Sequence, residues 1–485
     1  MKLNRTNPLF GRFFAGTTLT TTLVITLTAL FQPSAQAANL TWDANGPTAD
    51  VTNGAGNWDT SSVNWWDGAT NVTWTDGNTA VIGTNPLSGA GGTINFADAV
   101  DISALGLTVA DNGNATNHTL ASPTVGTMAL TIGTGGITAN DGITISHPFF
   151  MGGDQAWTRS ATGNGALTIT GNVDDNFVPR ALSLSSALGS GTVGIVLRGA
   201  LFHDGTTAIG DGYFQVRHDS FGQSAITLNG TVGGAQRIQF VNAAGTGSSG
   251  TLSNAIALGN GKEGNLFVWG GFTTNVQQPI TGGDASSVLR KSDGGTLILE
   301  NDNTYIGATI VDTGTLQLGT GATTGSIDSS ASLAINGSAI VDIRRSGTTL
   351  LSDLFPGAAG ALSATFGGND ARLNFSGALQ SDTLTIDQDL GNNLANGQLR
   401  VSSGTMTLVS GSDLTLRSLS VGHTTAASGN VGTLDVGTGT NVTLTPVSTS
   451  VAALNLGDSN GNAGIMNMTG GTVTTNSNAT GSIRV

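Results

Sequence analysis

The sequence that decides the fold reads GNVGTLDV at residues 429–436 and returns as GNAGIMNM at residues 461–468. A second pair accompanies it, LSVG at residues 419–422 and LNLG at residues 454–457. Copies that recur 32 and 35 residues apart are typical of solenoids and propellers, in which each repeat is one structural unit. They favour a chain that coils and stacks equivalent positions on one another.

Short alternating runs surround these copies along the chain. They include ALTI at residues 129–132 and 166–169, LIL at residues 297–299 and LQL at residues 316–318. Alternation with β-branched residues predicts half-buried strands, and the Gly, Asn, Asp and Ser residues between the runs predict turns. Because propeller blades need about four longer strands each, these short strands favour a parallel β-solenoid.

The composition agrees with an all-β chain. Gly provides 73 of the 485 residues, while charged residues make up only 10%, against about 25% in ordinary soluble domains. Glu and Lys, which fill helix surfaces, occur only at Glu263, Glu300, Lys2, Lys262 and Lys291. In a solenoid, Gly and Asn suit the tight corners, and charges are disfavoured because equivalent side chains of neighbouring coils lie side by side.

Charge and cysteine content exclude several classes of function. The net charge of −14 comes from 31 acidic and 17 basic residues, which repel phosphate backbones, so we expect no nucleic-acid partner. The absence of Cys excludes disulfides, thiolate nucleophiles and Cys-ligated metals. We expect no cofactor. Turns such as residues 111–114 and 458–462 could hold Ca²⁺ through oxygen atoms, although the spacing of a calcium loop that ends in Glu is missing.

The N-terminus has the organisation of a secretory signal peptide. Lys2, Arg5 and Arg12 precede the apolar stretch 19–30, and the small-residue sequence AQA ends at Ala37. We predict cleavage after Ala37, which leaves 448 residues with a net charge of −17 from 14 basic and 31 acidic residues. No later segment reaches the roughly 18 apolar residues of a membrane helix, so we expect no membrane span in the mature chain and a secreted or cell-surface location.

The most specific motif lies at residues 289–318, which read LRKSDGGTLILENDNTYIGATIVDTGTLQL. This segment resembles the autotransporter-associated β-strand repeat, also called the passenger-associated transport repeat. The family pattern is a Lys followed by Gly-Thr-Leu, Asn-Thr-Tyr, Gly-x-Thr-x-Val and a second Gly-Thr-Leu. The matching positions are Lys291, Gly295, Thr296, Leu297, Asn303, Thr304, Tyr305, Gly307, Thr309, Val311, Gly314, Thr315 and Leu316.

Residues 191–216 look like a decayed second copy of this repeat. They keep GTV at residues 191–193 and Gly205-x-Thr207, but His203-Asp204 replaces Asn-Thr-Tyr. The resemblance implies a right-handed parallel β-helix, exported as a passenger, whose repeats assist its passage across the outer membrane. It implies a structural motif without catalytic, cofactor-binding or metal-binding residues. The expected partners are the outer-membrane export machinery and, for an adhesive protein, surface glycans or matrix.

We expect four segments along the chain. Residues 1–37 form the signal peptide, 38–125 a Trp-rich cap with the first β coils, 126–349 the β-helix with the family repeats, and 350–485 a second β-solenoid segment. A complete autotransporter ends in a membrane barrel, whereas the sequence from residue 476 onward stays repeat-like. A terminal coil without a polar cap exposes a strand edge, so we expect the last segment to continue or to be truncated.

Five Trp residues lie between Trp42 and Trp74. Exposed, coplanar indoles would form a carbohydrate-stacking platform, whereas buried indoles would form a hydrophobic cap on the first coil. Because solenoids need capping, the cap is the favoured interpretation. A glycan-binding module is one alternative to the structural function.

A polysaccharide-active enzyme is the other alternative. Its candidate residues are Asp174-Asp175 with Arg180, and the run Arg217-His218-Asp219, since paired carboxylates on one face can act as general acid and base. No other motif of such enzymes is present, so we interpret these residues as turns. The five His residues are never four positions apart, which gives little support to a transition-metal site. We therefore predict a non-enzymatic, exported structural or adhesive protein.

Overall fold

The computed structural model divides the chain into two compact units, Met1–Gln36 and Ala37–Val485. The predicted signal peptide up to residue 36 lies outside the described residues. The structure describes residues 37–48, 50–83, 90–97, 100–111, 117–122, 129–189, 191–327, 330, 332–355, 364–366, 371–387, 397–409, 412–422, 429–446, 453–457, 461–475 and 483–484.

The described part of the second unit consists of short strands in three sheets of 14 strands and one sheet of three. The first sheet contains β1 (Asn39–Trp42), β3 (Trp65–Trp66), β4 (Asn71–Val72), β5 (Thr79–Ile82), β7 (Ile102–Val109), β9 (Leu130–Ala139), β11 (Phe149–Met151), β12 (Gln155–Arg159), β14 (Val173–Asp174), β15 (Leu182–Ser186), β17 (Thr206–Ile209), β19 (Ala225–Leu228), β23 (Ile256–Leu258) and β26 (Ile280–Gly282).

The second sheet contains β2 (Gly56–Trp58), β6 (Thr93–Phe96), β8 (His118–Ala121), β10 (Ile143–Ile145), β13 (Leu167–Ile169), β16 (Ile195–Leu197), β18 (Tyr213–Val216), β20 (Gly230–Thr231), β21 (Arg237–Phe240), β24 (Lys262–Phe267), β27 (Val288–Ser292), β29 (Ala308–Val311), β31 (Leu333–Ile335) and β34 (Ala364–Phe366).

The third sheet contains β22 (Gly250–Leu252), β25 (Thr273–Val276), β28 (Thr296–Leu299), β30 (Thr315–Leu318), β32 (Ile340–Ile343), β33 (Thr348–Leu350), β35 (Arg372–Ser376), β36 (Thr383–Ile386), β37 (Gln398–Leu408), β39 (Ser418–Val421), β40 (Val431–Val436), β42 (Leu454–Leu456), β43 (Ala463–Met468) and β45 (Ile483–Arg484). The three-stranded sheet contains β38 (Leu414–Leu416), β41 (Asn441–Leu444) and β44 (Thr472–Thr475).

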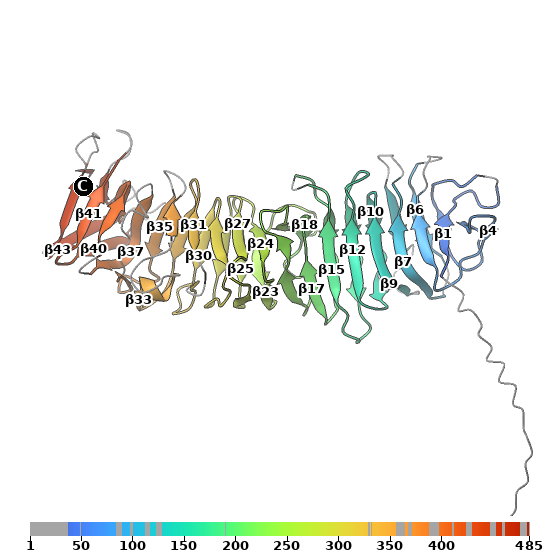
Figure 1. Cartoon of the computed structure of the whole chain (residues 1–485), viewed down its shortest axis with the longest axis horizontal. Helices are drawn as coiled ribbons and strands as arrows, with labels where there is room; N and C mark the ends of the chain where they lie inside the picture. Colours follow the sequence, from blue (N-terminus) through green and yellow to red (C-terminus); the bar gives the residue numbers. More distant parts are fainter. Residues whose placement is uncertain are drawn as a thin grey trace, which may run out of the picture. The chain divides into compact units, whose positions relative to one another are not determined.

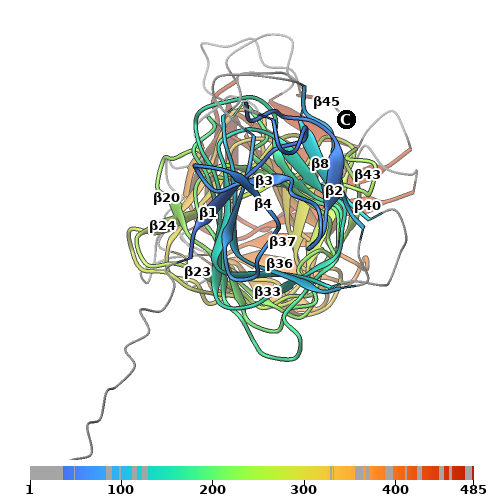
Figure 2. The same ribbon diagram turned by 90° about the vertical axis from the view of Figure 1, so that its right-hand side faces the viewer.

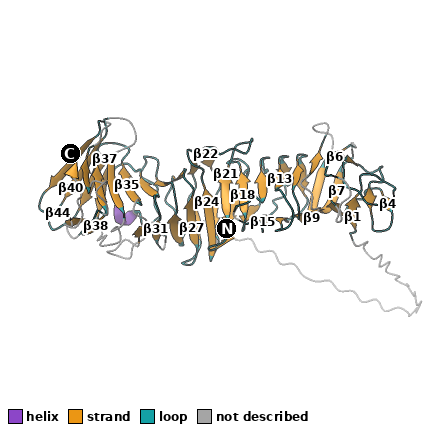
Figure 3. Ribbon diagram, turned by 90° about the horizontal axis from the view of Figure 1, so that it is seen from above, coloured by secondary structure: helices purple, strands orange, loops and turns teal. Residues whose placement is uncertain are grey.

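Helical structure is confined, within the described residues, to the single 3₁₀ turn η1 (Leu351–Asp353), coloured purple in Figure 3. No helix in that part of the chain is long and apolar enough to cross a membrane. Strand β32 pairs with β35 across residue 350, so the ladder of the third sheet passes this position. The division into segments at residues 125 and 349 stays a prediction.

Neighbouring strands pair in parallel, and each sheet grows in sequence order. The antiparallel strand pairs among the described residues are β1 with β3, β3 with β4, and β20 with β24. Within the second unit, the colours therefore run in order from the blue strand β1 to the orange-red strand β43 (Figure 1). Figure 2 looks along this stack, with successive coils lying over one another. The predicted all-β, parallel β-solenoid is confirmed.

The internal sequence copies are neighbours in the stack. Val431 pairs with Ala463 and Val436 with Met468, which places residues 429–436 in register with residues 461–468. Leu419 pairs with Leu454 in the same way. Similar residues recur because they occupy equivalent positions in adjacent coils, where the same side chain meets the same surroundings.

The core follows from the alternation within each strand. In β28 the inward side chains Leu297 and Leu299 are fully buried, and the same alternation of buried and half-buried residues recurs in most strands. The inward residues form one continuous cluster from Leu40 to Leu454. Because the side-chain period of a strand is two, a slip of one residue would turn this whole apolar set outward. The hydrophobic pattern therefore fixes the register.

Candidate functional site

The repeat at residues 289–318 contributes strands to two successive coils. In the second sheet β27 pairs with β29, so that Leu289 lies beside Thr309. In the third sheet β28 pairs with β30, so that Leu297 lies beside Leu316. The two Gly-Thr-Leu triplets at residues 295–297 and 314–316 are thus direct neighbours in successive coils. The motif repeats internally because its two halves occupy equivalent positions in neighbouring coils.

Lys291 occupies an inward position in an otherwise aliphatic column. Its neighbours along the second sheet are Leu266 on one side and Val311 on the other, and Ile335 follows. The side chain is only 1% exposed, and a buried charge must be satisfied by hydrogen bonds. The ammonium Nζ donates to the carbonyl oxygens of Ser292 at 3.2 Å and Thr313 at 2.9 Å, and also to that of Asp293.

These contacts join two successive coils at their corner, since Ser292 ends β27 and Thr313 precedes β30. Burial lowers the pKa of Lys291 to about 8. The nearby negative charges of Asp293 and Asp312 favour the charged ammonium group and raise the pKa by less than burial lowers it. Lys291 therefore pins the corner carbonyls of both coils from inside the stack.

Asn303 and Tyr305 form a second buried contact between coils. Asn303 Nδ2 donates to the carbonyls of Asn301 and Ser326, both at 2.8 Å, while its Oδ1 accepts from the amide of Ile280 at 2.9 Å. One side chain thus bonds the preceding coil and the following one. Thr304 between them is exposed, and its amide donates to the Ile280 carbonyl at 2.9 Å.

Tyr305 is fully buried, and its hydroxyl lies 2.5 Å from Thr309 Oγ1. The same Thr309 oxygen lies 2.9 Å from Ser330 Oγ, which in turn donates to the Gly307 carbonyl at 2.7 Å. Desolvation raises the pKa of the Tyr305 phenol, so this group stays neutral. The chain of hydroxyls satisfies every polar atom that the ring brings into the core.

Two glycines of the motif are required by close backbone approach. A Cβ atom added to Gly307 would lie 2.4 Å from the carbonyl oxygen of Ser287 in the preceding coil. Gly314 has a φ of +71°, and its Cβ would lie 2.4 Å from the Gly295 carbonyl and 2.7 Å from Lys291 Nζ. The other motif positions are structural too: Leu297, Val311 and Leu316 are buried, and Thr296 and Thr315 are paired neighbours in the ladder.

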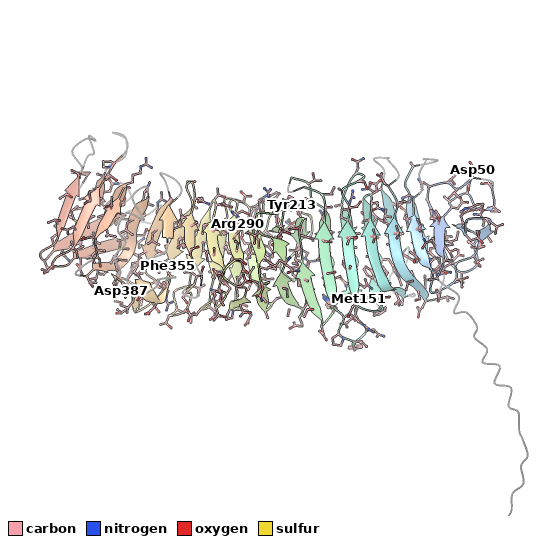
Figure 4. The ribbon with its side chains drawn as sticks, viewed as in Figure 1. Asp50, Met151, Tyr213, Arg290, Phe355 and Asp387 are labelled. Carbon is pink, nitrogen blue, oxygen red and sulfur yellow. The ribbon has the colours of Figure 1, made fainter. Side chains whose placement is uncertain are left out.

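Outside the core, an ion-pair network crosses the same coils. Arg290, labelled in Figure 4, donates from Nε to Glu263 at 2.7 Å and from Nη1 to Asp312 at 2.8 Å. Glu263 belongs to β24 and Asp312 follows β29, so the guanidinium links three successive coils. Arg is suited to this position because its planar fork of donors can bind two carboxylates at once.

The decayed copy at residues 191–216 keeps the hydroxyl network with a different ring. His203 Nε2 lies 2.9 Å from Thr207 Oγ1, which lies 2.8 Å from Ser224 Oγ. His203 stands four residues before its threonine, as Tyr305 does before Thr309. The corresponding strands of the two copies lie in different sheets, because β17 belongs to the first sheet and β29 to the second. The sequence similarity alone does not indicate that His203 replaces Tyr305.

We expect His203 to make stability depend on pH. Its Nδ1 is buried without a hydrogen-bond partner, and desolvation lowers its pKa below 6.5, more than Asp175 and Asp204 raise it. As the pH falls, the His203 side chain therefore binds a proton at a higher pH in the unfolded chain than in the folded chain. Stability is full above about pH 6.5 and is lost as the pH falls below that value.

Thermal melts at pH 7.5 and pH 5.0 measure this effect. The His203→Tyr variant, which restores the residue of the intact repeat, should show a smaller fall in Tm on acidification than the parent chain. His118 and His218, whose pKa values burial also lowers, account for the fall that remains. An identical fall in both proteins would contradict the assignment.

Four of the N-terminal Trp residues are buried, as the cap interpretation expects. Trp42, Trp58, Trp65 and Trp74 are at most 3% exposed. Their rings meet edge to face or tilted, with Trp58 and Trp65 centroids 4.7 Å apart at 62°. Trp66, the fifth, is half-buried. The four buried indoles close the first coils through their own contacts, an arrangement that gives aromatic pairs extra stability.

The candidate acidic residues accept hydrogen bonds from backbone amides. Asp174 accepts from the amide of Asn176 at 2.8 Å, and Asp175 accepts from the amide of Asp204 at 2.9 Å. Arg180 lines a hollow of about 260 Å³ with Asp175. In the other run, Arg217 pairs with Asp219 at 2.5 Å and His218 stacks on Phe240 at 4.7 Å. The contacts of Asp175 and His218 reach residues 29 and 22 positions further along the chain, whereas Asn176 and Asp219 lie two residues from their partners Asp174 and Arg217.

No group of three His, Cys, Asp or Glu side chains in the described residues is arranged to hold a metal ion. His423 and most of the predicted calcium turns lie outside those residues, in 423–428, 112–116 and 458–460. Calcium binding therefore stays a prediction.

Comparison with known proteins gives one match. Residues 289–318 match the family described as the passenger-associated-transport-repeat. We found no significant match to the chain among curated proteins or among solved structures. The matched segment coincides with the buried contacts of Lys291, Asn303 and Tyr305 described above.

Proposed function

Because this chain carries a repeat of autotransporter passengers, we propose that it is an exported, non-enzymatic β-helical passenger of the cell surface, with a structural or adhesive role. We further propose that coil-by-coil folding of the repeat outside the inner membrane helps to draw the chain across the outer membrane. The observation that carries this proposal is the buried network at residues 289–318. It bonds each coil to the one before and the one after, so that each folded coil templates the next.

The proposed mechanism depends on the difference in stability between a complete and an incomplete hydrogen-bond network. Lys291 and Asn303 find all their partners only when two or three successive coils are in place. An incomplete network leaves buried polar groups unsatisfied, which costs about 1–3 kcal/mol each. Completion of the repeat therefore disfavours backward sliding of the folded segment into a narrow export channel.

An export assay tests the proposal. The full chain is expressed in an outer-membrane-bearing bacterium with its export partner, and surface exposure is measured by protease accessibility in intact cells. The Tyr305→Ala variant should accumulate on the periplasmic side. The matched control is Ile306→Ala, which alters the adjacent side chain that is 50% exposed and should reach the surface like the parent. Equal surface exposure of all three proteins would reject the role in export.

We also propose that the role rests on binding and not on catalysis, since the candidate carboxylates Asp174 and Asp175 accept hydrogen bonds from the backbone amides of Asn176 and Asp204. Release of reducing ends or of unsaturated products from acidic and neutral polysaccharides by the purified chain would instead support the enzyme alternative.

A further inference from the structure

A polar hollow of about 780 Å³ opens on the outer face of the third sheet. Its floor comes from β32, β35 and β37, where the register places Asp342 beside Asn374 and Asn374 beside Arg400. The turn at residues 377–380 and the pair Gly429-Asn430 contribute the walls. The hollow is therefore built by three coils that follow one another in the stack.

The hollow gathers positive charge in a chain that is otherwise acidic. Three of the 17 basic residues of the chain, Arg344, Arg372 and Arg400, line it. Asp342 is the only carboxylate among its lining residues. Since the chain has a net charge of −14, three guanidinium groups at one place mark a site for a negatively charged ligand.

Asp342 is engaged by the floor itself. Its Oδ1 accepts from Asn374 Nδ2 at 2.7 Å, and Ser376 Oγ lies 2.7 Å from Oδ1 and 2.9 Å from Oδ2. Burial raises the pKa of this carboxyl, against the hydrogen bonds and the Arg344 charge that lower it. The three guanidinium groups outnumber this one carboxyl group, so the lining residues carry a positive net charge.

The remaining lining groups suit a sugar. Asn374, Ser402 and Asn430 present amides and a hydroxyl beside the guanidinium groups, with Ser402 Oγ donating to Asn374 Oδ1 at 2.8 Å. A guanidinium carries five N–H donors, so it can hold a neighbour such as Gln398, 3.4 Å from Arg372 Nε, together with a ligand. Planar guanidinium groups match planar carboxylates in bidentate geometry.

The three arginines are spread over the hollow and do not form one column. They come from successive coils, but Arg372 is in register with Gln398 and Arg400 with Asn374, while Arg344 lies four residues past Ile340, the partner of Arg372. Cationic groups placed apart in this way suit a ligand that carries more than one acid. A nucleic acid is disfavoured, because its dense phosphates would also meet the acidic surface of the rest of the chain.

We propose that this hollow binds an acidic oligosaccharide through the carboxylates of its uronic acid units, with Arg344, Arg372 and Arg400 as the recognition residues. Thr315 of the repeat lines the hollow, but the three arginines lie outside residues 289–318. Binding is measured on the purified chain, so its outcome is independent of the export proposal.

Isothermal titration with a uronic acid hexasaccharide tests the site. Arg372→Gln combined with Arg400→Gln should weaken binding about a hundredfold, because the loss of one charge-assisted contact weakens binding about tenfold and this variant removes two. The matched control is Arg237→Gln, which removes a guanidinium that lies over Phe267 in the second sheet, 5.5 Å from the ring centroid. Circular dichroism verifies folding, and Arg344→Gln replaces the double variant if that protein does not fold.

Three further ligands distinguish the chemistry. A neutral hexasaccharide of the same length should not bind, and a sulfated hexasaccharide and a single-stranded oligonucleotide of equal charge should bind more weakly than the uronate. The proposal is overturned if the uronate does not bind at millimolar concentration, if the arginine variants bind it unchanged, or if any of these three ligands binds at least as tightly.

Discussion

Replacing Tyr305 by alanine should lower the local free energy of unfolding around the repeat by about 3–5 kcal/mol, the range for removing a large aromatic ring from a core. The ring is fully buried between Leu-lined coils, and its hydroxyl takes part in the network with Thr309 and Ser330. Loss of the ring leaves a cavity and breaks that network. A stacked-coil protein can unfold in parts, so the measurement is hydrogen exchange of the amides in β27–β31.

Two control variants separate the contributions. Tyr305→Phe removes only the hydroxyl, and Thr309 keeps its contact with Ser330, so we expect a loss of about 1 kcal/mol. Ile306→Ala changes a half-exposed neighbour and should stay within about 0.5 kcal/mol. A loss in Tyr305→Ala no larger than that in Ile306→Ala would show that the ring does not hold the coils together.

Gly307→Ala should destabilise the same region by about 3 kcal/mol, although it adds only one methyl group. The new Cβ would lie 2.4 Å from the Ser287 carbonyl oxygen and 2.6 Å from its carbon. These are backbone atoms of the preceding coil, so the clash is relieved only by separating the two coils. Hydrogen exchange should therefore report faster exchange in both coils.

Gly294→Ala is the matched control within the repeat. The nearest atom to its added Cβ is the Gly270 Cα at 3.5 Å, an ordinary contact. That substitution should be neutral or slightly stabilising, because alanine restricts the unfolded chain. Equal destabilisation by the two substitutions would mean that loss of glycine flexibility, and not the approach of neighbouring coils, explains the effect.

Much of the fold could be predicted from the sequence because equivalent positions of stacked coils take similar residues, so that the pairing register is visible as a sequence repeat. The copies at 429–436 and 461–468 are paired residue for residue. The decayed copy at residues 191–216 resembles the repeat at residues 289–318 for another reason. Strands β17 and β18 form the same local strand–turn–strand as β29 and β30, but each strand lies in a different sheet from its counterpart. Sequence similarity alone does not separate these two cases, since both arise from the same residue preferences.

The chemistry inside and outside the stack was less predictable. A lysine normally lies at a surface, so nothing in the sequence placed Lys291 in a column between Leu266 and Val311. Arg400 stands 26 residues after Asn374, and Asn374 stands 32 after Asp342. Because the loops between these strands differ in length, no fixed period in the sequence brings those side chains together. The hollow therefore needed the structure.

Disulfide cross-linking across the repeat tests the stacking most directly, since the chain has no Cys of its own. Thr296 and Thr315 are paired between β28 and β30, and neighbouring strands about 4.8 Å apart allow a disulfide. Cysteines at Thr296 and Gln317 would be shifted by two residues, which puts their Cα atoms beyond the limit of about 7 Å. The structure predicts rapid oxidation of the first pair and little of the second. Efficient cross-linking of the shifted pair, or none of the aligned pair, would contradict the in-register stack.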